Sequence, residues 1–174
     1  MKMAFDAFLK IDGIPGESLD DKFKDWIEIL SYTHGATQAT SATASSSGGA
    51  SSERVNLSDF TVIKYVDKAS PKAFESCCKG QHIKEVVLNL NRAGGDKLTY
   101  MTITLEEVVI SSVTFPGNMP VAGETKAESD LPLEEIKFNF SRIKIAYTQQ
   151  KRSDGAGGGK VAGGWDRSLN KVYS

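Results

Sequence analysis

Residues 86–114 read VVLNLNRAGGDKLTYMTITLEEVVISSVT, and this stretch decides the fold. Apolar residues alternate with polar ones along 86–92, which is the period of a half-buried β-strand. The tetrapeptide Ala-Gly-Gly-Asp at 93–96 is typical of a hairpin turn. Residues 98–114 alternate again over a longer run, with Tyr100, Thr102, Thr104, Glu106, Val108 and Ile110 expected on one face. The stretch therefore predicts a long antiparallel hairpin.

Further strands are predicted on both sides of this hairpin. They cover residues 3–10, 26–32, 55–66, 134–149 and 160–168, which gives about seven strands in all. We expect a bend near Ser58-Asp59 and a phase slip near Ser141-Arg142, where a bulge would fit. Residues 12–16 and 153–159 have the composition of turns, and residues 19–24 and 115–133 that of loops.

One helix is predicted, beginning near Ser70. Ser70 suits the N-cap, Pro71 the first helical position, and Gly80 the C-terminal cap. The expected buried face is Ala73, Phe74, Cys77 and Cys78. A single short helix among hairpin-linked strands indicates a mainly β fold, an antiparallel barrel or sandwich with the helix packed against it.

Size and charge limit the class of protein. The chain has 174 residues, 40% of them hydrophobic and 25% charged, which suits one globular domain. A formal net charge of −1 argues against a nucleic-acid binder. Asp6 and Lys10 interrupt the N-terminal apolar residues, so we expect no signal peptide, and no apolar run is long enough for a membrane helix.

Candidate chemistry is sparse, and we expect neither catalysis nor a cofactor or metal. His34 and His82 lack ligand spacing to the adjacent Cys77-Cys78 pair. The glycines before Lys160 lack the Ser or Thr and the helix that a phosphate-binding loop needs. Glu106 and Glu107 are neighbours on a predicted strand and should point to opposite faces, which would prevent a paired-carboxylate mechanism.

Residues 36–52, ATQATSATASSSGGASS, hold no charge, aromatic residue or large aliphatic residue. Such a segment cannot bury enough apolar area to offset its own ordering entropy. Two interpretations stay open at this point. The segment is a disordered surface loop, or it becomes ordered against a neighbouring subunit, where small side chains permit close backbone approach.

The chain resembles the Hcp (haemolysin-coregulated protein) family of bacterial type VI secretion nearly end to end. The resemblance rests on AFDAFLKIDGIPGES at 4–18, WIEILSYTHG at 26–35, the strand, helix, hairpin and serine pair within 51–113, FNFSRIKIAYTQQ at 138–150 and the final GGW. The stretch 51–113 is the most specific. The position of His34 is often aromatic in relatives, so we assign it no family role.

The resemblance implies one domain over residues 1–174, an antiparallel β-barrel of two sheets with one helix and an extended loop at about 36–52. It implies a homohexameric ring, and rings that stack into a tube with a surrounding sheath and a spike protein at its tip. The tube is expected to be made in the cytoplasm and exported without a signal peptide. Small effector proteins are expected in the lumen. Contacts between subunits or rings are expected at Gln38, Thr40, Ser41, Thr43 and Ser47, and a lumen-facing effector contact at Thr33.

Two other functions stay open from the sequence. One is a small-ligand-binding barrel or small hydrolase, which would need an apolar pocket with convergent polar groups. The other is a secreted virulence-associated protein that acts outside the cell, which is compatible with the tube role. No nucleic-acid partner and no membrane insertion are expected.

Overall fold

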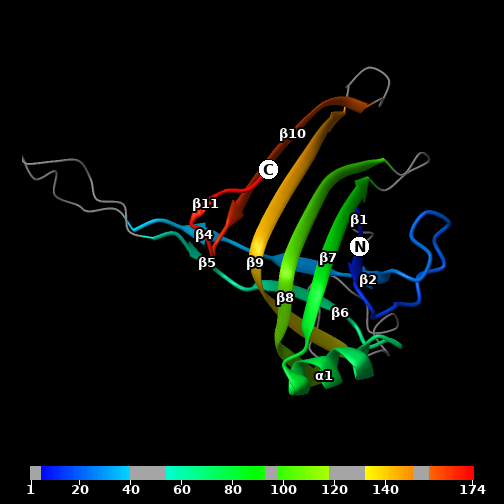
Figure 1. The fold of residues 1–174 in the computed structure, drawn as a ribbon. Coiled ribbons are helices and arrows are strands. Elements are labelled where there is room, and N and C mark those ends of the chain that lie inside the picture. The colour runs from blue at the N-terminus through cyan, green and yellow to red at the C-terminus, as the bar shows by residue number, and fades with distance from the viewer. Residues whose placement is uncertain (1–4, 40–53, 93–97, 118–131, 151–156) are drawn as a thin grey trace, which may run out of the picture.

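The computed structural model describes residues 5–39, 54–92, 98–117, 132–150 and 157–174. The mainly β class and the short helix predicted from the sequence are confirmed (Figure 1). In chain order the elements are β1 (Phe5–Ile11), β2 (Ile27–Ile29), β3 (Ser31–Thr33), β4 (Ala36–Thr37), β5 (Asn56–Leu57), β6 (Phe60–Tyr65), α1 (Ser70–Lys79), β7 (His82–Arg92), β8 (Thr99–Gly117), β9 (Leu133–Gln150), β10 (Gly157–Asp166) and β11 (Lys171–Val172).

The main sheet has nine strands and curves around the core. Its longest path runs β11–β10–β9–β8–β7–β1–β2, with every neighbouring pair antiparallel. The first half of β9 also pairs with β6, and β6 pairs with β3. Because β3 follows β2 directly through Leu30, the paired strands continue around the core and return to β9. Strands β4 and β5 form a separate two-stranded sheet.

Two predicted strands are each divided in the structure, and β4 and β11 were not predicted, so the expected count of about seven is below the eleven strands among the described residues. The strand predicted at 26–32 breaks at Leu30, because β2 pairs with β1 whereas β3 pairs with β6. The strand predicted at 55–66 breaks at Ser58-Asp59, where a bend was expected. The hairpin turn at 93–96 and most of the predicted turn at 153–159 and loop at 115–133 lie outside the described residues.

The three long strands change their buried face at one common level. The buried residues that flank the change are Ile83 and Val86 on β7, Leu105 and Val108 on β8, and Phe140 and Ile143 on β9. Register is continuous there, with Glu106 opposite both Glu85 and Arg142. The predicted slip at Ser141-Arg142 is therefore confirmed, but it is shared by the neighbours rather than a bulge in one strand. The single continuous face predicted for 98–114 is wrong, because Glu107 has a positive φ of 52°.

Helix α1 differs from its prediction in its cap and in its buried face. Ala69, not Ser70, is the N-cap residue, and Ser70 turns its hydroxyl into the protein. The buried helix residues are Ser70, Ala73 and Ser76, while Phe74 is half exposed and Cys78 is exposed. The C-terminal cap is confirmed, because Gly80 has a φ of 59° and its N–H donates to the Cys77 carbonyl.

A buried ion pair fastens this helix to the sheet. The Nζ of Lys64, on β6, lies 2.7 Å from Glu134 Oε2, on β9, and both side chains are fully buried. The same ammonium donates to Asp67 Oδ1, Ser70 Oγ and the Tyr65 carbonyl at 2.8–3.2 Å. Ser70 Oγ donates to Glu134 Oε2 at 2.6 Å. The first turn of α1 is thus tied to two strands through one charged cluster.

Candidate assembly surface

Strand β10 has an open outer edge along most of its length. On its inner side it pairs with β9 from Lys160 to Asp166. On its outer side β11 covers only Trp165 and Asp166, and the Tyr173 N–H donates to the Gly164 carbonyl. Beyond that point no described strand lies beside residues 160–163 (Figure 1). An unpaired edge of this kind is a template for a strand of another chain.

Beside this edge, the face of the sheet that carries the core residues becomes exposed to solvent. Leu90, Met101, Tyr147 and Val161 lie opposite one another on β7, β8, β9 and β10. Their exposure rises in that order, from 2% at Leu90 to 48% at Tyr147 and 71% at Val161. In the next row Ile103 is buried, whereas Ile145 is 36% exposed. We call Ile145, Tyr147 and Val161 the apolar flank.

The sequence alone did not reveal the apolar flank. The alternation of Ile143, Ile145 and Tyr147 places the three side chains on one face of the strand, but only Ile143 is buried. Gly163 lies opposite Ile145 and has no side chain to cover it. The signal that could have revealed this exposure is the run of glycines in β10. Glycines have no side chain to cover the large apolar side chains of the neighbouring β9.

A two-stranded arm, β4 with β5, projects from the domain on the side where β11 lies (Figure 1). Its root is held at Gly35 and Ser58. The Ser58 N–H donates to the Gly35 carbonyl at 3.0 Å, and the Gly35 N–H donates to Ser58 Oγ at 2.9 Å. Both β4 residues are exposed. The arm thus carries the chain into the small-residue segment from a fixed base.

The predicted contact residues are only partly within the described chain. Gln38 follows β4 and is exposed. Thr40, Ser41, Thr43 and Ser47 lie outside the described residues. Thr33 is exposed at the end of β3, where it pairs with Thr61. The roles assigned to these residues stay predictions.

His34 packs into the base of the arm. Its ring lies 5.8 Å from the Phe60 ring and 5.5 Å from the Phe140 ring, and its Nδ1–H donates to the Ser58 carbonyl. Burial lowers the pKa of His34, the bond to Ser58 partly opposes this, and the charge of Arg167 lowers the pKa further. The folded arm therefore favours the neutral imidazole of His34 over the protonated one.

Acidification is expected to loosen this base. Because the pKa of His34 in the folded chain lies below its usual value of about 6.5, its contribution is complete above that pH and is lost as pH falls through the folded pKa. His34→Phe keeps the ring contacts but cannot take up a proton. We expect the thermal midpoint of the wild type to fall more than that of His34→Phe between pH 7.5 and 5. Equal losses would contradict this role.

The described residues contain no cluster suited to a metal. No group of three or more His, Cys, Asp and Glu among them could hold an ion. The prediction that Glu106 and Glu107 point apart is wrong, because both reach the Arg142 guanidinium, at 2.9 Å and 3.6 Å. The positive φ of Glu107 redirects its side chain. In the part of the chain that the structure describes, no helix is long and apolar enough to cross a membrane.

The curved antiparallel sheet, its one described helix and the projecting arm define a mainly β protein with the architecture of a solved type VI secretion protein. A family model described as "Type VI secretion system effector, Hcp" matches residues 8–147. The protein Hcp1 of Pseudomonas aeruginosa is 34% identical over 169 residues, which cover 97% of this chain and 98% of that relative. The chain belongs to the Hcp family of type VI secretion tube and effector proteins.

Solved structures agree with this assignment. A structure described as a type six secretion system protein superposes with a TM-score of 0.86 and 31% identity, over 98% of this chain and all of the other. Hcp1 from Salmonella typhimurium gives a TM-score of 0.78 and 32% identity over the same shares. The likeness therefore spans nearly the whole of both chains in each case.

Proposed function

We propose that copies of this chain form a homohexameric ring, and that such rings stack into the exported inner tube of a type VI secretion apparatus. Family membership supports the type of machine. The observation that carries ring formation is the apolar flank beside the open edge of β10. A second copy placed there would pair with the edge and remove Tyr147 and Val161 from water together. Such a head-to-tail contact closes into a ring when its rotation permits.

The chain acts in this account as a structural, non-enzymatic subunit. It is made in the cytoplasm, passes through the sheath behind a spike protein and is exported by the type VI apparatus. The arm and the small-residue segment beyond it, with Gln38, Thr40, Ser41, Thr43 and Ser47, contact a neighbouring subunit or ring. Two surface cavities, one lined by Arg54 and Arg167 and the other by Lys72, Glu75 and Lys79, have charged residues in their walls. Charged walls favour a structural subunit over a small-ligand barrel, whose pocket would be mostly apolar.

Effector carriage in the lumen is the second part of the proposal, with Thr33 as a contact. Rings purified from the native host should retain a small protein that mass spectrometry identifies. Thr33→Arg should release that protein without dispersing the rings. If Thr33→Arg rings still retain the protein, Thr33 is not part of the contact. If wild-type rings never retain a protein, effector carriage is contradicted.

A charge on the apolar flank is expected to disperse the rings. Val161→Glu puts a carboxylate among side chains that the neighbouring copy should cover, and we expect roughly a hundredfold higher concentration for half-assembly. Lys160→Gln makes the same change in charge on the opposite face of β10 and should assemble as the wild type does. The readouts are light scattering and negative-stain microscopy. Equal assembly by both variants would contradict the proposed interface.

A further inference from the structure

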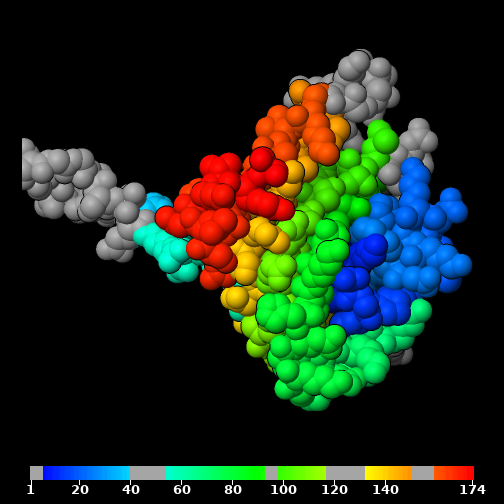
Figure 2. Space-filling model, in the orientation of Figure 1, coloured from blue at the N-terminus to red at the C-terminus, as the bar shows by residue number. Residues whose placement is uncertain are grey.

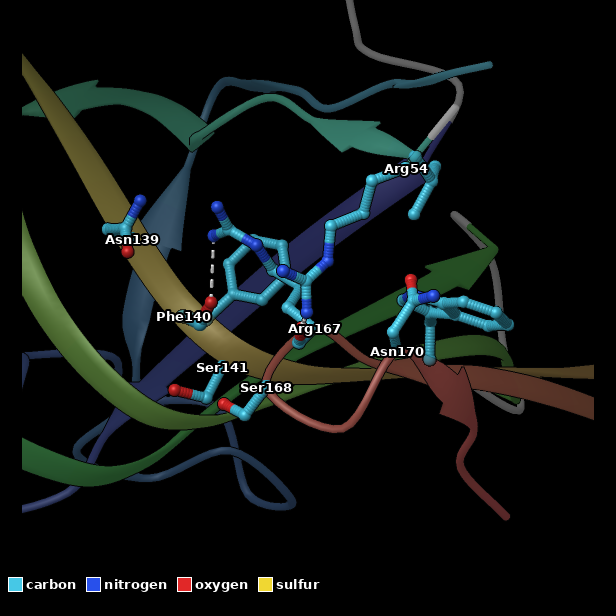
Figure 3. Close-up of a pocket in the computed structure, with 9 residues that line it drawn as sticks. Arg54, Asn139, Phe140, Ser141, Arg167, Ser168 and Asn170 are labelled. Atoms are coloured by element: carbon cyan, nitrogen blue, oxygen red, sulfur yellow. Dashed lines mark hydrogen bonds between the residues drawn. The ribbon is translucent and has the colours of Figure 1, made fainter. Parts of the chain in front are cut away.

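A surface cavity lies where β9 changes its partner. On that edge β9 pairs with β6 up to Phe138 and with β10 from Arg142 onward, so Asn139, Phe140 and Ser141 have no strand beside them there. The cavity opens at this gap, with a volume of about 330 Å³, and includes Arg54 and Arg167 (Figure 3). It is therefore a consequence of the sheet topology, and neither arginine was singled out by the sequence.

The two arginines are fixed in place but not neutralised. Arg167 Nη1 donates to the Phe140 carbonyl at 2.9 Å, and its guanidinium lies 5.6 Å from the centre of the Phe140 ring. Arg54 Nη2 donates to the Arg167 carbonyl at 3.1 Å. Figure 3 shows both side chains directed over Phe140. Each guanidinium keeps further N–H donors, and neither forms an ion pair with any described residue.

One further donor in the cavity wall also lacks an acceptor. The Nε1–H of Trp165, which lines the cavity, is buried without a hydrogen-bond partner among the described residues. Asp59, which contacts the lining residue Asn139, is engaged elsewhere, because it accepts from Asn139 Nδ2 and Ser111 Oγ. Two neighbouring cations and an unpaired donor together fit a planar anion, and a carboxylate matches the guanidinium fork best.

The same chain offers such a carboxylate on its far side. Residues 12–28 contain six carboxylates and two lysines. This segment lies at the opposite side of the molecule from β11 and the arm (Figure 2). Within it Leu19 is 93% exposed, and the neighbouring Asp21 is exposed and has no hydrogen bond or ion pair in the described chain. The Asp20 N–H donates to Ser18 Oγ, which holds the turn in shape.

We propose that the Arg54–Arg167 cavity of one copy receives the Asp21 carboxylate of the next copy. The acidic segment and the basic cavity lie on opposite sides of one chain, so the contact is head to tail and every copy uses both halves. Leu19 enters beside the carboxylate and covers apolar surface at the rim. This inference rests on the proposed assembly and assigns it a specific charged contact.

A charge exchange within one chain tests the contact. Arg167→Glu alone and Asp21→Arg alone should each raise the concentration for half-assembly at least about tenfold. The double variant restores opposite charges across a head-to-tail contact and should return to within about threefold of the wild type. Lys171→Glu makes the same change in charge as Arg167→Glu outside the cavity and should have little effect. Arg54→Glu with Asp21→Arg repeats the test if Arg167→Glu fails to fold.

The outcomes separate this proposal from the proposed function. A wild-type chain that never assembles would overturn the ring itself. A wild type that assembles while the double variant stays as weak as the single ones would overturn only the Asp21 contact. A second experiment asks whether the cavity binds a small free carboxylate instead of Asp21 from another copy. Propionate is titrated onto the unassembled Val161→Glu variant, with the Trp165 indole signal as readout. Propionate binding without rescue by the double variant would assign the cavity to a small carboxylate and contradict the second copy.

Discussion

Replacing Lys64 by Met is expected to lower the free energy of unfolding by about 3–5 kcal/mol. The substitution leaves the Glu134 carboxylate fully buried without its ammonium partner. Glu134 Oε1 already has no hydrogen-bond partner among the described residues, so only the bond from Ser70 would remain. The expected cost arises from that uncompensated charge more than from the loss of an attraction. Urea unfolding measures it.

A double variant separates these two causes. Lys64→Met with Glu134→Leu removes both buried charges, and replacing a buried pair by apolar residues is often neutral. We therefore expect the double variant to recover most of the lost stability, although Ser70 and Asp67 lose partners. A cost below about 1 kcal/mol for Lys64→Met alone would contradict the assignment of this cluster as the tie between α1 and the sheet.

Gly164→Ala is expected to cost about 2–3 kcal/mol. A Cβ at this position would lie 2.5 Å from the Tyr173 carbonyl oxygen and 2.6 Å from the Ile143 carbonyl oxygen. Both are backbone atoms, so either the C-terminal residues move outward or β10 separates from β9. The hydrogen bond from the Tyr173 N–H to the Gly164 carbonyl would be strained in the first case.

The neighbouring glycine provides the matched control. A Cβ at Gly163 meets nothing within 4 Å, so Gly163→Ala should change stability by less than about 1 kcal/mol. Both alanines are best measured in the Val161→Glu background, because assembly would otherwise add to the apparent stability. Equal stability of the two variants would show that Gly164 is not the close contact between β10 and its neighbours.

Local patterns predicted most of the fold. The alternation in 86–114 and 134–149 located the long strands, and Gly80 correctly marked the end of the helix. The helix face was predicted correctly at Ala73 and Cys77, which lie against the core, and wrongly at Phe74 and Cys78, which are exposed. The charged cluster also draws Ser70 inward, which amphipathic spacing did not predict. No local pattern shows that three strands change face together at one level, since that depends on their pairing.

The surface was predicted less well than the core. The small-residue segment at 36–52 was singled out from composition, but four of its five assigned residues lie outside the described chain. The apolar flank and the arginine cavity were missed. Both depend on which strand stands beside which: Ile145 is exposed because Gly163 lies opposite, and the cavity exists because β9 changes partner at Phe140. Such features depend on which strands pair with one another, and the residue pattern within one strand does not show this.

The mass of the assembled particle tests the central claim most directly. Native mass spectrometry of the purified chain at tens of micromolar should give a closed species with six times the 18.8 kDa mass of one copy, or a multiple of that ring. Val161→Glu should give the single chain under the same conditions. A wild-type chain that stays at 18.8 kDa throughout this range, with no larger species, would contradict the account.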